Sequence, residues 1–155
     1  MLLGVATRAL GRPFAEALRA GGVARALVVC GAEGLDEISC AGETWAWRLD
    51  PDGTITEHVL HPTQFGLGTH PLKAVVGGDA RENAATLRAL LAGGEVEEKL
   101  VPVMEWVLMN AAALLVVAGV AVDGVDGVRL ARESVASGRA REALETFRAA
   151  GSAAS

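Results

Sequence analysis

The feature that most constrains the fold is an apolar segment followed by a glycine and two adjacent acids, ARALVVCGAEGLDEIS at residues 24–39. The run Ala26–Cys30 has the length of a buried strand, and the loop after Gly31 places Asp36 and Glu37 side by side. In open α/β folds ligands bind beyond the carboxyl ends of the strands, and carboxylate oxygens suit a hard cation such as Mg²⁺. The segment therefore predicts a metal site in which Asp36 and Glu37 are the ligands. A solvated turn is the alternative role for this acidic pair.

The residues before this segment predict a βαβ unit. Leu2–Ala6 is a short apolar run, and Ala15–Ala20 has a helical pattern that ends at Gly21 and Gly22. We expect Pro13 in the first turn of that helix or between two short turns. A strand, a helix and a strand in about thirty residues require a parallel strand pair with a right-handed crossover.

A β-hairpin is predicted next. Thr44–Leu49 and Thr54–Leu60 contain strand-forming residues, and the turn residues 50–53 (Asp-Pro-Asp-Gly) join them. Trp45 and Trp47 fall on one face of this hairpin. We expect them to pack on the core or on a helix rather than to stack on nucleic-acid bases, because no basic residues lie between them.

Four helices complete the predicted α/β fold. Asp79 and Glu82 have the spacing of a capping box at the start of the first helix. The helical patterns cover Ala84–Leu91, Glu97–Gly119, Val125–Ser137 and Arg139–Ala149. The sequence thus predicts one α/β domain over residues 1–150 and a frayed tail over residues 151–155.

Composition excludes several classes of protein. A net charge of −5 argues against nucleic acid or an anionic membrane surface as a partner. Cys30 and Cys40 lie in no metal-binding motif, which predicts reduced thiols and a cytoplasmic location. The apolar run Trp106–Val122 contains Asn110 and Gly119 and lacks nearby basic residues after it, so we expect a buried helix rather than a membrane span.

Other polar residues are predicted to have structural roles. We expect His58, His61 and His70 to be surface or loop residues, because their spacings fit no helical ligand pair and no acid pairs with them in an obvious motif. Residues 77–79 (Gly-Gly-Asp) are expected to cap a helix rather than to cradle a phosphate, since they lack the P-loop ending. Asn110, inside an apolar helix, is expected to bond the backbone of a neighbouring loop.

Several segments together resemble the anthranilate phosphoribosyltransferase family in order and spacing. They are LLGV (2–5), FAEALRAGG (14–22), ALVVCGAEGLDEIS (26–39), HPTQFGL (61–67), GGDARENAATLRALLAG (77–93), VLMNAAALLVVAG (107–119) and GVRLARESVASGRAREALE (127–145). The resemblance implies transfer of phosphoribosyl from phosphoribosyl pyrophosphate to anthranilate in tryptophan biosynthesis. It also implies a small helical domain beside a larger α/β domain, and a homodimer formed through the helical domain.

The resemblance assigns Mg²⁺ as cofactor and Asp36 and Glu37 as its ligands. The family's other motifs are a Gly-Thr-Gly-Gly-Asp diphosphate loop, a Lys-His-Gly-Asn segment and an arginine beside the anthranilate carboxylate, and none of these motifs occurs here. We therefore expect the C-terminal part of the α/β domain only, with no catalytic or substrate-binding residue and without the dimer surface. We also expect negligible activity from this chain alone, an unpaired edge of the sheet and weak stability in isolation. The alternatives are a non-catalytic remnant that binds a homologous chain, or the same fold with another substrate, as in nucleoside phosphorylases.

Overall fold

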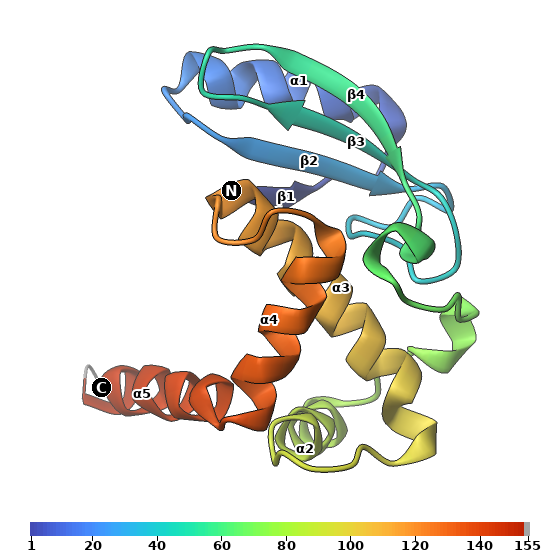
Figure 1. The fold of residues 1–155 in the computed structure, drawn as a ribbon, viewed down its shortest axis with the longest axis vertical. Helices are drawn as coiled ribbons and strands as arrows, with labels where there is room; N and C mark the ends of the chain where they lie inside the picture. The colour runs from blue at the N-terminus through green and yellow to red at the C-terminus, as the bar shows by residue number, and fades with distance from the viewer. Residues whose placement is uncertain (154–155) are drawn as a thin grey trace.

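The computed structural model describes residues 1–153, which contain a four-stranded mixed sheet of order β1-β2-β3-β4 (Figure 1). The strands are β1 (Leu2–Gly4), β2 (Ala26–Gly31), β3 (Thr44–Leu49) and β4 (Ile55–Leu60). The first pair is parallel and the other two pairs are antiparallel, so that Leu3, Val28, Trp47 and Glu57 form one row across the sheet. The predicted α/β class, the βαβ unit and the β-hairpin are confirmed.

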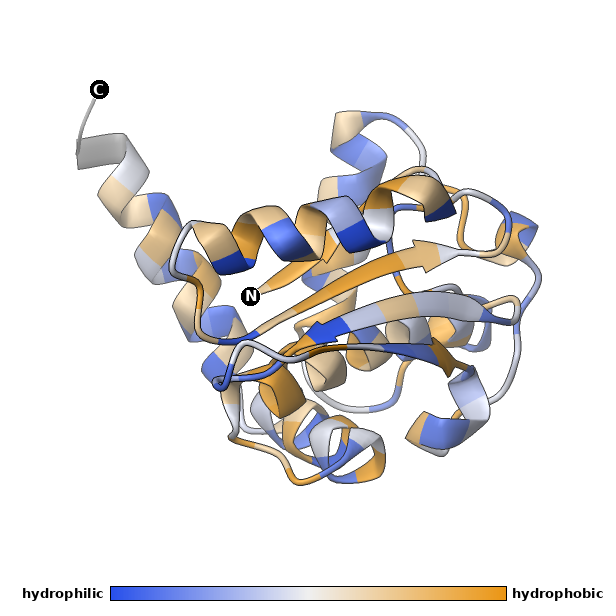
Figure 2. Ribbon diagram, turned by 90° about the horizontal axis from the view of Figure 1, so that it is seen from above, coloured by the Kyte–Doolittle hydropathy of each residue, from blue (hydrophilic) through white to orange (hydrophobic). Residues whose placement is uncertain are grey.

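The two faces of the sheet bury different clusters, because strand residues alternate between faces. Val28, Cys30 and Trp47 lie in the cluster beneath α1 (Arg8–Ala20). Leu27 and Val29 face the other way and join a cluster with α3 and the loops after β2 and β4. In Figure 2 helix α1 crosses over the sheet and alternates between hydrophilic and hydrophobic colours, as expected for a helix with one buried side.

Helix α1 begins earlier than predicted. Its N-cap is Thr7, and Pro13 lies inside the helix rather than in its first turn or between two short turns, so that prediction is wrong. The reason is packing against the sheet. A Cβ on Gly11 would come within 2.1 Å of the Trp47 ring, so this first half of the helix lies directly on β3. The contact offsets the hydrogen bond that proline cannot donate.

Both tryptophans of the hairpin pack as predicted. Trp47 is buried beneath α1, and the Arg8 guanidinium lies over the Trp45 ring at 4.8 Å from its centroid. These contacts anchor α1 to the sheet.

The other face of the sheet is covered by α3 (Val101–Ala118), which packs along α4 (Gly124–Ala136). The two helices approach closely, since a Cβ on Gly127 would lie 2.8 Å from the Ala112 side chain. The segment Glu98–Ala118 is long and apolar enough to cross a membrane by length and composition. The buried residues of α3 are Met104, Leu108, Met109, Ala112 and Ala113, and 28% of the apolar segment is buried, so packing accounts for part of its apolar character.

The predicted capping box is present at α2 (Ala80–Leu90). The Glu82 backbone N–H donates to Asp79 Oδ1 at 2.9 Å, and the Asp79 N–H donates to Glu82 Oε2 at 2.8 Å. Helix α5 (Arg139–Ala153) projects from the rest of the chain (Figure 1). Residues 151–153 of the predicted tail are thus helical, and residues 154 and 155 lie outside the described residues.

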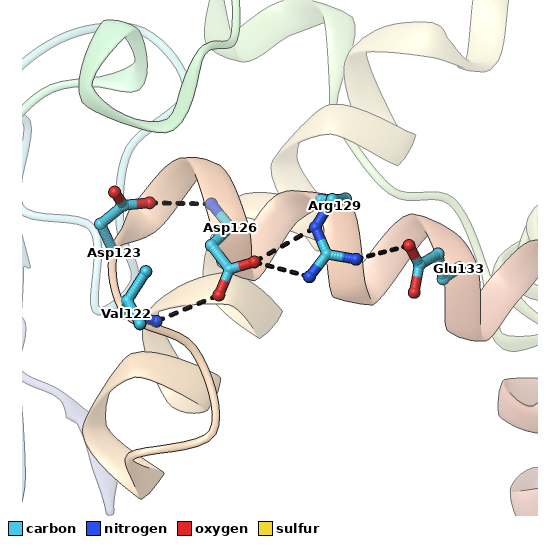
Figure 3. A network of polar contacts seen from close by, with 5 residues as sticks. All are labelled: Val122, Asp123, Asp126, Arg129 and Glu133. Atoms are coloured by element: carbon cyan, nitrogen blue, oxygen red, sulfur yellow. Dashed lines mark hydrogen bonds and ion pairs between the residues drawn. The ribbon is translucent and has the colours of Figure 1, made fainter.

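A polar network fixes the start of α4 (Figure 3). Asp123 is its N-cap and accepts from the Asp126 N–H at 2.8 Å. Asp126 accepts from the Val122 N–H at 3.1 Å and from Arg129 Nη2 at 2.7 Å, and Arg129 also reaches Glu133. Hydrogen bonding from Arg129, and next from the Val122 backbone, lowers the pKa of Asp126.

Candidate functional site

The candidate site is the loop of residues 32–43 between β2 and β3, called here the acidic loop. Asp36 and Glu37 are exposed on it. Neither side chain has an ion pair or hydrogen bond within the part of the chain that the structure describes. Desolvation, and next the neighbouring charge of Asp36, raises the pKa of Glu37. Two adjacent carboxylates without a counter-charge leave room for a bound cation.

The acidic loop fits a magnesium ion better than a transition metal. Among residues 1–153 no group of three or more His, Cys, Asp or Glu residues could hold a metal. The protein thus offers two carboxylates. Magnesium is commonly held by one or two carboxylates, while water and phosphate oxygens complete its shell.

The residues that follow the acidic pair are buried and bonded. Ser39 is fully buried; its N–H donates to Thr44 Oγ1 at 2.9 Å, and its hydroxyl donates to a carboxylate oxygen of Glu33. The Cys40 carbonyl accepts from the His70 N–H at 2.8 Å. Burial and hydrogen bonds therefore fix the backbone directly after the two exposed acids.

Strand β1 supports the acidic loop from beside the sheet. A Cβ built on Gly4 would lie 1.5 Å from the Asp36 carbonyl oxygen. At this distance the two atoms would overlap, so no residue with a side chain fits at position 4 without a shift of the backbone. The absence of a side chain at Gly4 lets the backbone of Asp36 lie against the end of β1. Sequence reasoning missed this role, because a glycine at a strand end is equally typical of a turn that needs no close neighbour.

Helix α3 supports the acidic loop from the other side. Asn110 Oδ1 accepts from the Ile38 N–H at 3.1 Å, and Trp106 Nε1 donates to the Ile38 carbonyl at 2.8 Å. The prediction that Asn110 bonds the backbone of a neighbouring loop is confirmed. The loop in question is the one that carries the acidic pair.

The three histidines are surface or loop residues, as expected, since His58 is exposed and His61 and His70 lie outside helices and strands. His58 and His61 have local threonine partners, but His70 Nε2 lies 2.7 Å from Glu105 Oε2 of α3. Arg132 Nη2 of α4 lies 3.8 Å from the other oxygen of Glu105. Residues so far apart in sequence give no spacing signal. This contact links the loop after β4 to both helices and lies outside the acidic pair.

Curated relatives are similar to this chain in sequence. Residues 1–141 match the family model described as "Glycosyl transferase family, a/b domain". The chain is 45% identical over 146 residues to an anthranilate phosphoribosyltransferase of Schizosaccharomyces pombe, covering 94% of this chain and 40% of that protein. It is 41% identical over 146 residues to one of Rubrobacter xylanophilus, covering 94% of this chain and 41% of that protein.

Solved structures share the fold. Anthranilate phosphoribosyltransferase from Saccharomyces cerevisiae in complex with PRPP and Mg matches with a TM-score of 0.85 at 32% identity. The Thermus thermophilus enzyme matches with a TM-score of 0.80 at 38% identity. Both matches cover 94% of this chain and 41% of the other, so the chain spans about two fifths of its relatives' length. Sequence and fold agree over nearly the whole chain, which therefore belongs to the anthranilate phosphoribosyltransferase family, within its glycosyl transferase α/β domain.

Proposed function

We propose that residues 1–150 are the C-terminal part of the α/β domain of a cytoplasmic anthranilate phosphoribosyltransferase. In this role Asp36 and Glu37 hold Mg²⁺ during transfer of phosphoribosyl from phosphoribosyl pyrophosphate to anthranilate. The observation that carries the proposal is the acidic loop. Its two exposed carboxylates have no partner among the described residues, and the residues directly after them are buried.

The chain's own residues contribute charge and position. Their two negative charges attract a divalent cation, and the fixed backbone of the residues that follow them lowers the cost of ordering the loop on binding. Bound Mg²⁺ supplies positive charge that stabilises a pyrophosphate leaving group. The groups that bind the sugar diphosphate and anthranilate have no counterpart among the family motifs present in this sequence, so we propose that the rest of a complete enzyme supplies them.

Titration with Mn²⁺, a paramagnetic substitute for Mg²⁺, tests this proposal. Free Mn²⁺ is measured by electron paramagnetic resonance as the 155-residue chain is added. Asp36→Asn and Glu37→Gln should each weaken binding at least tenfold. Glu43→Gln is the matched control, because Glu43 is an exposed acid of the same loop. Equal affinities for all three variants and the unchanged chain would refute the metal site.

The second candidate function is binding to a homologous chain without catalysis. Strand β1 forms an edge of the sheet within the described residues, and Val107 and Leu114 of α3 are each 47% exposed. Unpaired strand edges and exposed apolar side chains favour association. Co-purification with a full-length relative, lost on Leu114→Glu but kept on Leu144→Glu of the projecting α5, would support this role.

A further inference from the structure

Two side chains of α3 bind both polar groups of one residue in the acidic loop. The Ile38 N–H donates to Asn110 Oδ1 at 3.1 Å. The Ile38 carbonyl accepts from Trp106 Nε1 at 2.8 Å and from Asn110 Nδ2 at 3.3 Å. Trp106 and Asn110 are four residues apart, so they lie on the same side of the helix.

These bonds act on the peptide groups beside the acidic pair. The N–H of Ile38 belongs to the same peptide plane as the carbonyl of Glu37, and this plane sets the direction in which the Glu37 side chain leaves the backbone. The next peptide plane is held through the Ile38 carbonyl. The Ile38 side chain is completely buried, so its own packing adds a third hold at the same residue.

Both polar atoms of the Asn110 amide are already bonded within the chain. Its oxygen accepts from Ile38, and its amide nitrogen donates to the carbonyls of Ile38 and Trp106 at 3.3 and 3.1 Å. Its role is therefore exerted through Ile38. An amide suits this role because it offers a donor and an acceptor side by side.

We propose that Asn110, assisted by Trp106, is a positioning residue for the cation site, so that affinity at Asp36 and Glu37 depends on a helix that contributes no ligand. The inference rests on the proposed function. Groups that orient metal ligands in this way typically change metal affinity by about 10- to 100-fold when they are mutated.

Variants of α3 and the Mn²⁺ titration described above test the inference. Asn110→Ala removes three hydrogen bonds, and we expect about tenfold weaker Mn²⁺ binding, which corresponds to about 1.4 kcal/mol. Trp106→Phe keeps the ring and removes one donor, and we expect a smaller loss of about threefold. Leu108→Val is the control, because Leu108 packs in the cluster with Leu90 and Met104 and bonds no loop residue.

Amide hydrogen exchange supplies a readout that is independent of metal. Asn110→Ala should speed exchange of the Ile38 amide more than it speeds exchange in β2, whereas Leu108→Val should alter both alike. This comparison separates a local effect on the loop from a general loss of stability.

The outcomes distinguish the two proposals. If Asp36→Asn and Glu37→Gln weaken Mn²⁺ binding while Asn110→Ala and Trp106→Phe bind like Leu108→Val, the positioning role is overturned and the proposed function stands. If the unchanged chain binds no Mn²⁺, or the carboxylate variants bind equally well, the proposed function fails and the positioning role fails with it. Weaker binding in both sets, with faster exchange at Ile38, supports both.

Discussion

Replacement of Gly4 by alanine tests whether the end of β1 fixes the acidic loop. The added Cβ would lie 1.5, 2.3 and 2.9 Å from the carbonyl oxygen, carbonyl carbon and Cα of Asp36. All three are backbone atoms, so no side-chain rotation can relieve the overlap. Reaching ordinary contact at 3.4 Å requires a displacement of about 1.9 Å between the strand and the loop.

The strand has little freedom to make that displacement. Gly4 pairs with Val29 in the sheet, and the next N–H, of Val5, donates to the Val29 carbonyl at 2.9 Å. We therefore expect the loop to move. Overpacking of this kind typically costs about 1–3 kcal/mol, and for a rigid backbone contact we expect about 3 kcal/mol. In a chain of this size that free energy corresponds to a fall in Tm of roughly 6–12 °C.

Thermal unfolding followed by circular dichroism measures the stability change, and Mn²⁺ titration measures the change at the site. Gly42→Ala is the control, since a Cβ at Gly42 meets nothing within 4 Å and the loop is the same. The control should be neutral or slightly stabilised. A Gly4→Ala protein that melts within about 2 °C of the unchanged chain would refute the reasoning, because about 3 kcal/mol should lower Tm by more than that.

Three further measurements test other features of the chain. Glu37→Gln should stabilise the metal-free chain near neutral pH, because a raised folded-state pKa means that ionised Glu37 opposes folding. The gain in stability should vanish below the ordinary glutamate pKa. Mg²⁺ should offset the gain, because under the proposed function it binds the unchanged chain more tightly than the variant. Melting curves at several pH values measure this. Asp79→Ala should cost about 1 kcal/mol by removing the N-cap of α2, while Asp79→Ser, which keeps an acceptor, should cost less, as denaturant titration would show. Cys30 and Cys40 should react with a thiol reagent only after unfolding, since burial raises the pKa of both thiols and shields them.

Each of these expectations can fail in a recognisable way. A Glu37→Gln protein that is less stable at neutral pH without metal would mean that Glu37 has a favourable partner. Equal stability of the two Asp79 variants would mean that the cap bond contributes little to α2. Rapid modification of either thiol in the native state would place it at the surface.

Local sequence signals predicted most of the fold. The turn at residues 50–53 predicted the hairpin, and the Asp79–Glu82 spacing predicted the start of α2, because both depend on residues within one turn. The start of α1 was missed, because proline is typical of the first turn of a helix. Here packing of the helix against Trp47 outweighs that local preference of Pro13. Tertiary contact decided the position of that helix.

In the candidate site, too, local sequence signals predicted some residues, and contacts between distant parts of the chain determined the others. Asp36 and Glu37 were predicted as metal ligands because they are adjacent, follow an apolar strand and lie in a segment that resembles the family, and that assignment stays a prediction. Their supports could not be predicted in this way, because Gly4 and Asn110 reach the acidic loop from distant parts of the chain. No periodicity or spacing joins residues across such distances. The amide in an apolar helix was the one useful signal, since a lone buried polar group must find a partner.

The supports also explain how the chain can keep two unpaired acids together. Repulsion between Asp36 and Glu37 favours any loop conformation that separates them, and the pKa of Glu37 is raised by desolvation and, to a smaller extent, by the charge of Asp36. The opposing contributions come from elsewhere: the buried side chain of Ile38, its three bonds to α3, and the close contact at Gly4. In the proposed metal site, a loop whose backbone is held in this way would need less ordering when a cation binds, so less of the binding free energy would be used for it. If Asp36 and Glu37 hold a cation as proposed, the stability of the chain and its affinity for the cation are coupled through the same few residues, and a substitution at any of these supports should lower both.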